Sequence, residues 1–174
     1  MKDLALLTDF YQLSMMQGYF FTKPDQTAVF DVFYRKNPSG GGYAIFCGLN
    51  EVVDYIENLK FSEDDIAYLK SLNFFKPEFL EFLRGFKFSG EIYAMDEGQI
   101  VFPHEPLIRV KANIMEAQLI ETAILNTINF QTLVATKSSR ISFSAKGDLV
   151  MEFGLRRAQG RSAGVYGAKA AIIG

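Results

Sequence analysis

The stretch from Ile114 to about Lys146 contains neither glycine nor proline, the two residues that most strongly interrupt a helix. Its apolar side chains, among them Leu119, Ile124 and Ile128, recur at the intervals of a helical face. We therefore expect one long helix or two abutting helices here. Such a helix constrains the whole fold, because shorter elements on either side have to cover its apolar face.

The residues before this helix show alternating helical and strand patterns. Thr8 or Asp9 can cap a helix that continues for about ten residues, because a short oxygen-bearing side chain satisfies the free amides of a first turn. Alternating side chains predict a half-buried strand from Thr27 to Arg35. The glycine-rich segment 37–42 is then expected to be a loop of high backbone freedom.

Short helices and a meander of strands follow this loop. A strand at 43–46 leads into a helix over 49–59, Ser62 can cap the next helix, and Pro77 suits the first turn of a third. Residues 89–110 return to short strands, so the elements form an α+β layer. The expected boundaries are a first domain at 1–113, a helical connection at 114–147, and a strand with one helix at 148–174.

The chain is rich in apolar and aromatic residues for its length of 174 residues. Hydrophobic residues make up 49% of it, and its 17 Phe and 8 Tyr exceed what one small core readily hides. We expect an apolar interface that faces a second subunit, a further part of the protein, or both.

Charge and cysteine content argue against several classes of protein. Lys+Arg 18 against Asp+Glu 20 gives a formal net charge of -2 without a basic cluster, so nucleic-acid binding is not expected. The single Cys47 is expected to be a buried apolar residue, and it excludes an intrachain disulfide framework. His104, between two prolines, is expected in an exposed loop. No stretch approaches the roughly 20 apolar residues of a membrane span, so we expect a cytoplasmic protein.

An apolar run from Asp148 to Phe153 leads into Gly154 and then into two adjacent arginines, Arg156 and Arg157. Open α/β sheets and barrels bind ligands beyond the carboxyl ends of their strands, so the position of these arginines matters as much as their charge. Arginine offers a planar fork of donors that matches carboxylate or phosphate oxygens, and a phenylalanine ring offers a flat apolar face. The pattern predicts a strand that ends in a site for an anionic ligand.

Four segments of the chain, in this order, resemble those of the nicotinate phosphoribosyltransferases. They are LTDFYQL at 7–13, GGGYA at 40–44, NFQTLVATK at 129–137 and EFGLRRAQG at 152–160. The resemblance implies an enzyme of NAD salvage that joins nicotinate to 5-phosphoribosyl 1-pyrophosphate, with ATP hydrolysis and Mg²⁺ assisting. It also implies a mixed α/β sandwich followed by an irregular β/α barrel, and a homodimer whose active sites lie between subunits.

The same resemblance implies roles for individual residues. Phe153 would flank the pyridine ring, and Arg156, with Arg157 beside it, would hold the carboxylate or a nearby phosphate. Tyr11 would reach into the partner's site and close the other face of the ring, and Arg35 would meet a phosphate across the dimer. These five are the candidate substrate-binding residues, and no residue of the chain is expected to be catalytic or to bind a metal.

Members of this family are considerably longer than the chain, and their phosphate loops, most of their barrel and a phosphorylated histidine are expected beyond residue 174. The chain is therefore expected to be an N-terminal part that is inactive alone and carries no cofactor. Two alternatives remain: a nicotinamide- or quinolinate-specific relative, and a non-catalytic remnant that acts as an interaction module or an inert subunit.

Overall fold

The computed structural model of the protein describes residues 4–174. Its contacts divide the chain into two compact units, each assembled from segments that are far apart in the sequence. The first unit consists of the described residues up to Phe30 together with 50–93 and 109–125, and the second consists of 31–49, 94–108 and 126–174. These units are groups of residues in contact and do not follow the chain order, so they do not test the domain boundaries expected at 113 and 147, which stay a prediction.

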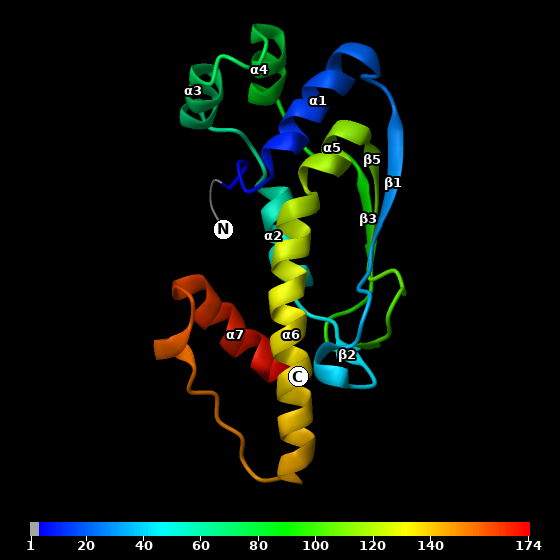
Figure 1. Ribbon diagram of the computed structural model, residues 1–174, viewed down its shortest axis with the longest axis vertical. Helices are drawn as coiled ribbons and strands as arrows, with labels where there is room; N and C mark the ends of the chain where they lie inside the picture. The colour runs from blue at the N-terminus through cyan, green and yellow to red at the C-terminus, as the bar shows by residue number, and fades with distance from the viewer. Residues whose placement is uncertain (1–3) are drawn as a thin grey trace. The chain divides into compact units, whose positions relative to one another are not determined.

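The first unit holds most of a three-stranded sheet and the helices that pack near it (Figure 1). The strands lie in the order β1 (Thr27–Val32), β5 (Ile108–Asn113), β3 (Glu91–Ala94). The helices are α1 (Phe10–Thr22), α2 (Leu49–Glu57), α3 (Glu63–Ser71), α4 (Pro77–Arg84) and α5 (Ile114–Leu119). Figure 1 shows α3 beside α4 and α1 beside α5, and both pairs are in contact. The mixture of helices and small sheets confirms the predicted α+β class.

Local sequence explains where several helices begin. The Ser62 hydroxyl accepts the N–H of Asp65, and the Asp65 carboxylate accepts the N–H of Ser62, which makes a capping box at the start of α3. Pro77 occupies the first turn of α4, where its missing N–H has no helical partner to lose. Both predicted helix starts are confirmed. Asn113 caps α5 by accepting the N–H of Met115.

A row of phenylalanine rings forms much of the core of the first unit. Phe79 is fully buried, and its ring centroid lies 5.9, 5.8 and 6.1 Å from those of Phe20, Phe75 and Phe82. The first two contacts are tilted and the third is stacked at a centroid distance too long for a face-to-face sandwich, arrangements that suit the charge distribution of aromatic rings. Other aromatic side chains stay exposed, Phe21 by 53%. The apolar interface expected from composition stays a prediction.

Tyr55 on α2 is buried in the first unit, and its hydroxyl has no hydrogen-bond partner in the described part of the chain. Burial disfavours the charged phenolate and raises the pKa of Tyr55 from 10.0 to about 12. The ring therefore contributes apolar burial to the core, whereas the unpaired hydroxyl weakens it.

The free energy of unfolding should fall as the pH rises from about 10 to about 12, because Tyr55 loses its proton first in the unfolded chain. Below this window both states are protonated, so Tyr55 gives no pH dependence there. Within the window its contribution should fall by about 1.4 kcal/mol per pH unit. Urea denaturation of Tyr55→Phe should show a shallower alkaline decline and no loss of stability at neutral pH. An equally steep decline in the variant would contradict this account.

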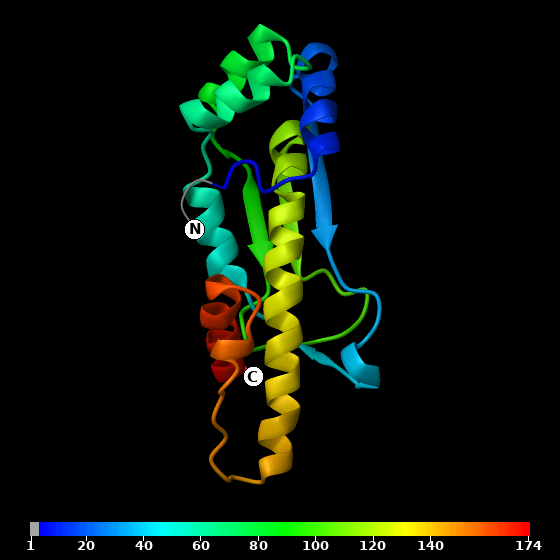
Figure 2. The same ribbon diagram turned by 60° about the vertical axis from the view of Figure 1, so that its left-hand side comes forward.

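The second unit is built around β2 (Ala44–Ile45) and the long helix α6 (Glu121–Ala145), whose first residues belong to the first unit. β2 pairs antiparallel with β4 (Ile100–Val101). Helix α7 (Arg161–Ile173) lies beside α6 in both ribbon views (Figures 1 and 2). The Ser138 hydroxyl on α6 donates to the carbonyl of Ala171 on α7 over 2.7 Å. The core of this unit joins both helices to β2 through four buried side chains: Ile45, Cys47, Ala135 and Ala170.

The structure confirms some expected elements and corrects others. The stretch from Ile114 forms two abutting helices, α5 and α6, with Ile120 between them. The strand from Thr27 ends at Val32 instead of Arg35, because the chain beyond it enters a loop held by other contacts.

No strand forms over residues 148–153, which have no regular secondary structure. A strand needs a neighbouring backbone to pair with, and the described strands pair only within the two small sheets. The expected strand is therefore wrong for this structure, and the β/α barrel stays a prediction.

Candidate functional site

The first motif, residues 7–13, ties the start of α1 to the junction between α5 and α6. The Thr8 hydroxyl donates to the carbonyl of Leu119 over 3.3 Å, at the point where α5 ends. Asp9 occupies the N-cap position of α1 but makes no capping hydrogen bond, and its Oδ2 instead accepts from the Thr122 hydroxyl over 3.1 Å. The predicted capping role is wrong because both side chains bond to this junction.

Tyr11 follows these ties, and its side chain is 51% exposed. Its hydroxyl accepts a hydrogen bond from Nε2 of Gln12 over 3.1 Å, and the same Nε2 donates to the Glu121 carboxylate. The negative charge of Glu121, followed by partial desolvation and the charge of Asp9, raises the pKa of Tyr11 above its ordinary value. The phenol is therefore protonated at neutral pH, and its ring is presented to solvent.

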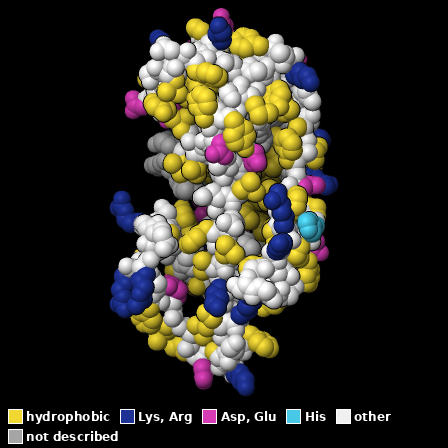
Figure 3. All heavy atoms as spheres, viewed as in Figure 1, with side chains coloured by type: hydrophobic (Ala, Val, Ile, Leu, Met, Phe, Trp, Pro, Cys, Tyr) yellow, Lys and Arg dark blue, Asp and Glu magenta, His cyan; other side chains and the backbone are white. Residues whose placement is uncertain are grey.

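Arg35 is exposed and lies in a loop of the second unit. Tyr34, the residue before it, is held in place by hydrogen bonds. The Tyr34 hydroxyl lies 2.8 Å from Oδ1 of Asn37 and 2.7 Å from the carbonyl oxygen of Val101. The N–H of His104 donates to the carbonyl of Tyr34 over 2.9 Å. Figure 3 shows this chain's one histidine at the surface next to Lys and Arg side chains, which confirms its predicted exposure.

Arg140 on α6 holds the glycine loop of the second motif in place. Its guanidinium donates to the carbonyls of Pro38 and Tyr43 over 3.0 and 3.3 Å, and it lies 5.9 Å from the ring centroid of Tyr43. A Cβ on Gly41 would come within 1.6 Å of Nη2 of Arg140, so the absence of a side chain at Gly41 leaves room for the guanidinium. Sequence reasoning missed this arginine.

The third motif supplies two further side chains on the same side of α6. The Thr136 hydroxyl accepts the N–H of Ile45 over 2.9 Å, and the Thr132 hydroxyl accepts the N–H of Cys47 over 3.2 Å. Thr132 also donates to the Cys47 carbonyl over 3.2 Å. Together with Arg140 these residues recur every four positions, a polar stripe that could have been found by reading polar as well as apolar periodicity.

Gly41→Ala should lower the free energy of unfolding by about 2 kcal/mol, because the new methyl group displaces the guanidinium of Arg140 from two carbonyls. The backbone itself tolerates alanine, since φ of Gly41 is -77°. Gly42→Ala is the matched control, because a Cβ there meets nothing within 4 Å. In an Arg140→Met background Gly41→Ala should lose most of its effect in urea denaturation. Equal effects in both backgrounds would show that the guanidinium is not what the methyl group displaces.

The fourth motif forms a loop before α7 that carries Phe153, Arg156 and Arg157 within five consecutive residues. The Phe153 side chain is 68% exposed, and the two arginines are exposed in the short 3-10 helix η2 (Leu155–Arg157). The Glu152 carboxylate accepts the N–H of Gly154, which turns the chain at this point. A flat ring and two guanidiniums are therefore available to a planar anion.

Helix η2 lies against the start of α7 and fixes the position of this loop. A Cβ on Gly164 would come within 2.4 Å of the Leu155 side chain, so the glycine permits the close approach. Gly160, with φ 90°, occupies the N-cap position of α7 in a left-handed conformation that favours glycine. The glycines of this segment therefore serve its packing and its turn.

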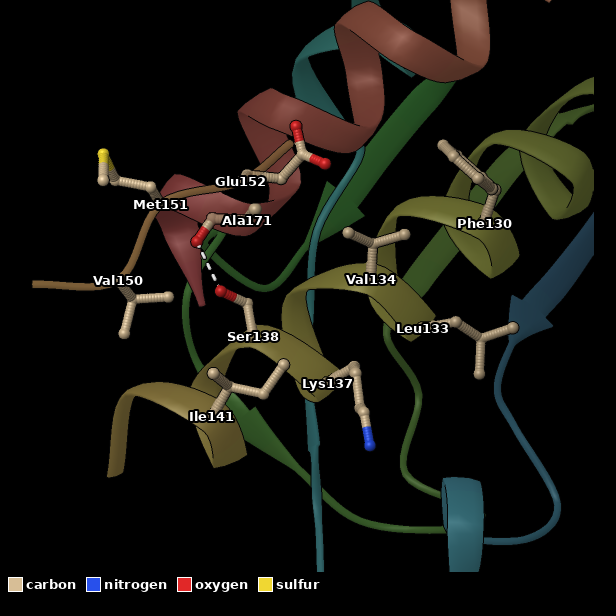
Figure 4. A pocket seen from close by; sticks show the side chains of 10 residues that line it. All are labelled: Phe130, Leu133, Val134, Lys137, Ser138, Ile141, Val150, Met151, Glu152 and Ala171. Atoms are coloured by element: carbon tan, nitrogen blue, oxygen red, sulfur yellow. Dashed lines mark hydrogen bonds between the residues drawn. The ribbon is translucent and has the colours of Figure 1, made fainter. Parts of the chain in front are cut away.

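A cavity of about 470 Å³ in the second unit borders this loop (Figure 4). Its walls come from α6, from residues 150–152 and from Ala171 of α7, and they are mainly apolar. Lys137 and Glu152 are the charged side chains of its lining. The cavity does not include any of the five candidate substrate-binding residues.

The five candidates are not all brought together. Phe153 lies just before the short helix that carries Arg156 and Arg157, whereas Tyr11 belongs to the first unit. Within the described residues of the second unit, no hydrogen bond, ion pair or ring contact joins Arg35 to that segment. Among residues 4–174, no group of three or more His, Cys, Asp or Glu side chains is placed to hold a metal ion. No helix in this range is both long and apolar enough to cross a membrane.

Comparison with known proteins identifies the family. The nicotinate phosphoribosyltransferase (NAPRTase) N-terminal domain matches residues 6–129, and the chain belongs to this family. It is 43% identical over 159 residues to a nicotinate phosphoribosyltransferase of Mycobacterium tuberculosis, a match that covers 91% of this chain and 34% of that protein. It is 45% identical over 173 residues to the Bacillus subtilis nicotinate phosphoribosyltransferase, covering 99% and 35%.

The fold agrees with a solved structure of the same kind. The crystal structure of human nicotinic acid phosphoribosyltransferase superposes with a TM-score of 0.87 at 32% identity, over 95% of this chain and 34% of that one. The chain thus spans about a third of the length of the relatives that it matches.

Proposed function

We propose that the chain is the N-terminal part of a nicotinate phosphoribosyltransferase, an enzyme that forms nicotinate mononucleotide from nicotinate and 5-phosphoribosyl 1-pyrophosphate. The observation that carries this proposal is the likeness to relatives of that name over nearly the whole chain, at 43% and 45% identity. The turn with an exposed aromatic ring and two exposed arginines supports it, because nicotinate is flat and anionic.

Each candidate residue has a role that fits its surroundings. Phe153 stacks on the pyridine ring, and Arg156 holds the carboxylate or a nearby phosphate, with Arg157 adding positive charge. Arg35 meets a phosphate, and Tyr11 covers the other face of the ring. Tyr11 and Arg35 act in the partner's site of a homodimer, to which the exposed apolar side chains of the chain offer an interface.

The reaction requires mainly positioning and charge stabilisation, because it transfers a 5-phosphoribosyl group to a ring nitrogen while pyrophosphate leaves from the same sugar carbon. This chain's contribution is to bind and orient the nicotinate ring and to neutralise anionic groups. ATP and Mg²⁺ belong to the complete enzyme in this proposal. The described residues offer no cluster of His, Cys, Asp or Glu side chains for a metal. The single buried cysteine fits a reducing cytoplasm.

Two arginines side by side favour an acid over an amide, so nicotinate is preferred to nicotinamide as the substrate. Quinolinate, with a second carboxylate, is the remaining competitor. A non-catalytic remnant is the alternative from a different class. The chain alone is proposed to be inactive, because it spans about a third of the length of the relatives that it matches.

A chimera tests the proposal: residues 1–174 replace the matching segment of the Bacillus subtilis relative. The chimera should form nicotinate mononucleotide when nicotinate, 5-phosphoribosyl 1-pyrophosphate, ATP and Mg²⁺ are supplied, whereas the chain alone should form none. Arg156→Ala in the chimera should lower kcat/KM for nicotinate by about 10- to 100-fold, because a charge-assisted hydrogen bond to the substrate is lost. Arg161→Ala, an exposed arginine at the start of α7, is the control.

Competition with nicotinamide and quinolinate in the same assay decides between the substrate classes. A folded but inactive chimera, beside an active Bacillus subtilis parent, would reject the proposed function and favour the remnant.

A further inference from the structure

Gln12 is an unusual residue in the first unit, because its amide side chain is completely buried beside an exposed tyrosine. Its Nε2 donates to the Glu121 carboxylate and to the Tyr11 hydroxyl, the latter over 3.1 Å. Its Oε1 is buried and has no hydrogen-bond partner in the described part of the chain. Both N–H groups of the amide therefore make hydrogen bonds, whereas its oxygen makes none among the described residues.

Glu121 explains this asymmetry. An ionised carboxylate can only accept hydrogen bonds, so the amide of Gln12 has to turn its NH₂ group toward Glu121. The two N–H groups of that nitrogen then serve Glu121 and the oxygen of Tyr11, while Oε1 is left facing the protein interior. Exchanging the two ends of the amide would place oxygen against carboxylate, which is unfavourable.

Packing alone does not account for an amide at this position. A buried carbonyl without a partner is unfavourable, and an unbranched apolar side chain of similar size would fill the same space without that loss. What glutamine provides is a second N–H that is aimed at Tyr11. A substitution of Gln12 by an apolar side chain of similar size would therefore keep the packing and remove only the hydrogen bonds.

The consequence falls on the orientation of the Tyr11 ring. A side chain that is 51% exposed has few neighbours to restrict its rotation, and a hydrogen bond at its far end supplies the missing restriction. Because the phenol oxygen accepts from Gln12, the hydrogen of the phenol is not used in this bond and is available for donation. The carboxylates of Glu121 and Asp9 hold the phenol in this protonated form.

We propose that Gln12 is a positioning residue for Tyr11: its amide, oriented by Glu121, fixes the direction of the tyrosine ring. The use of that ring as one wall of a nicotinate site rests on the proposed function. The restraint of the ring by Gln12 does not, because it depends only on contacts within the first unit.

The test measures the mobility of Tyr11 by fluorine NMR in the chain labelled with 3-fluorotyrosine, with the signal assigned through Tyr11→Phe. Tyr68 is an internal reference, since it is 57% exposed and its hydroxyl makes no hydrogen bond within the described part of the chain. In the parent chain the Tyr11 signal should relax faster than that of Tyr68, as expected for a restrained ring. In Gln12→Met, which keeps the volume and removes the N–H groups, the two rates should become alike.

Gln118→Met is the matched control, because Gln118 is also buried in the first unit but its Nε2 lies 3.3 Å from Sδ of Met15. It should leave the relaxation of Tyr11 at the parent rate. If Gln12→Met fails to fold, Glu121→Gln replaces it: the amide then loses its fixed orientation, and Tyr11 should become more mobile. A Tyr11 signal as mobile as Tyr68 in the parent, or unchanged in the folded variant, overturns the proposal.

A second readout connects the restraint to binding. In the chimera described above, Gln12→Met should raise KM for nicotinate by about tenfold with a smaller change in kcat, because a ring that is not held in place has to be ordered by the ligand. An inactive chimera would reject the proposed function and leave the NMR result standing. An active chimera with an unchanged KM would reject the positioning role in binding.

Discussion

The second unit depends on how the backbone of a very short strand is satisfied. β2 has a ladder partner on one side only, where the N–H of Phe46 donates to the carbonyl of Gln99 and extends the pairing with β4. The N–H groups of Ile45 and Cys47 point the other way, into the protein, and a buried N–H without a partner is unfavourable. On this side, where β2 has no neighbouring strand, hydroxyl groups of α6 accept hydrogen bonds from these N–H groups.

The match between helix and strand has a geometric basis. Four residues of an α-helix rise about 6 Å, and two residues of a strand advance about 6.6 Å. A side chain at every fourth position of α6 therefore meets every second residue of β2. Thr132 bonds to Cys47 and Thr136 to Ile45, and Arg140 continues the series to Tyr43. The glycine loop is thus placed by the same register that holds the strand.

Small residues make this close approach possible. Ala135 is fully buried between the two threonines, and a Cβ on Gly48 would meet the carbonyl of Thr127 at 3.2 Å. The third motif is therefore the helical surface that binds β2, the strand that begins at the last residue of the second motif. The same face of α6 continues to Arg140, which holds the loop that follows Arg35.

Sequence reasoning succeeded where a local signal decides the structure. The capping box at Ser62 and the two abutting helices from Ile114 follow from side-chain chemistry and spacing alone. It failed at residues 148–153, because strand formation depends on a partner that local sequence does not reveal.

The candidate site was predictable only in part. Phe153, Arg156 and Arg157 became candidates because charge and an aromatic ring stand close to each other in the sequence, and their role stays a prediction. The roles of Arg140 and Gln12 depend on residues about a hundred positions away, so no local pattern announces them.

The most direct measurement is the stability of the double variant Thr132→Val, Thr136→Val, which keeps the shape of α6 and removes both hydroxyl groups. We predict a loss of about 2 to 5 kcal/mol in the free energy of unfolding, because the N–H groups of Ile45 and Cys47 are left buried without acceptors. Their amide hydrogen exchange should also become faster. Thr127→Val, a buried threonine on the same helix, is the control and should cost less. A double variant as stable as the parent, with unchanged exchange at both amides, would contradict the central role of this helix-to-strand contact.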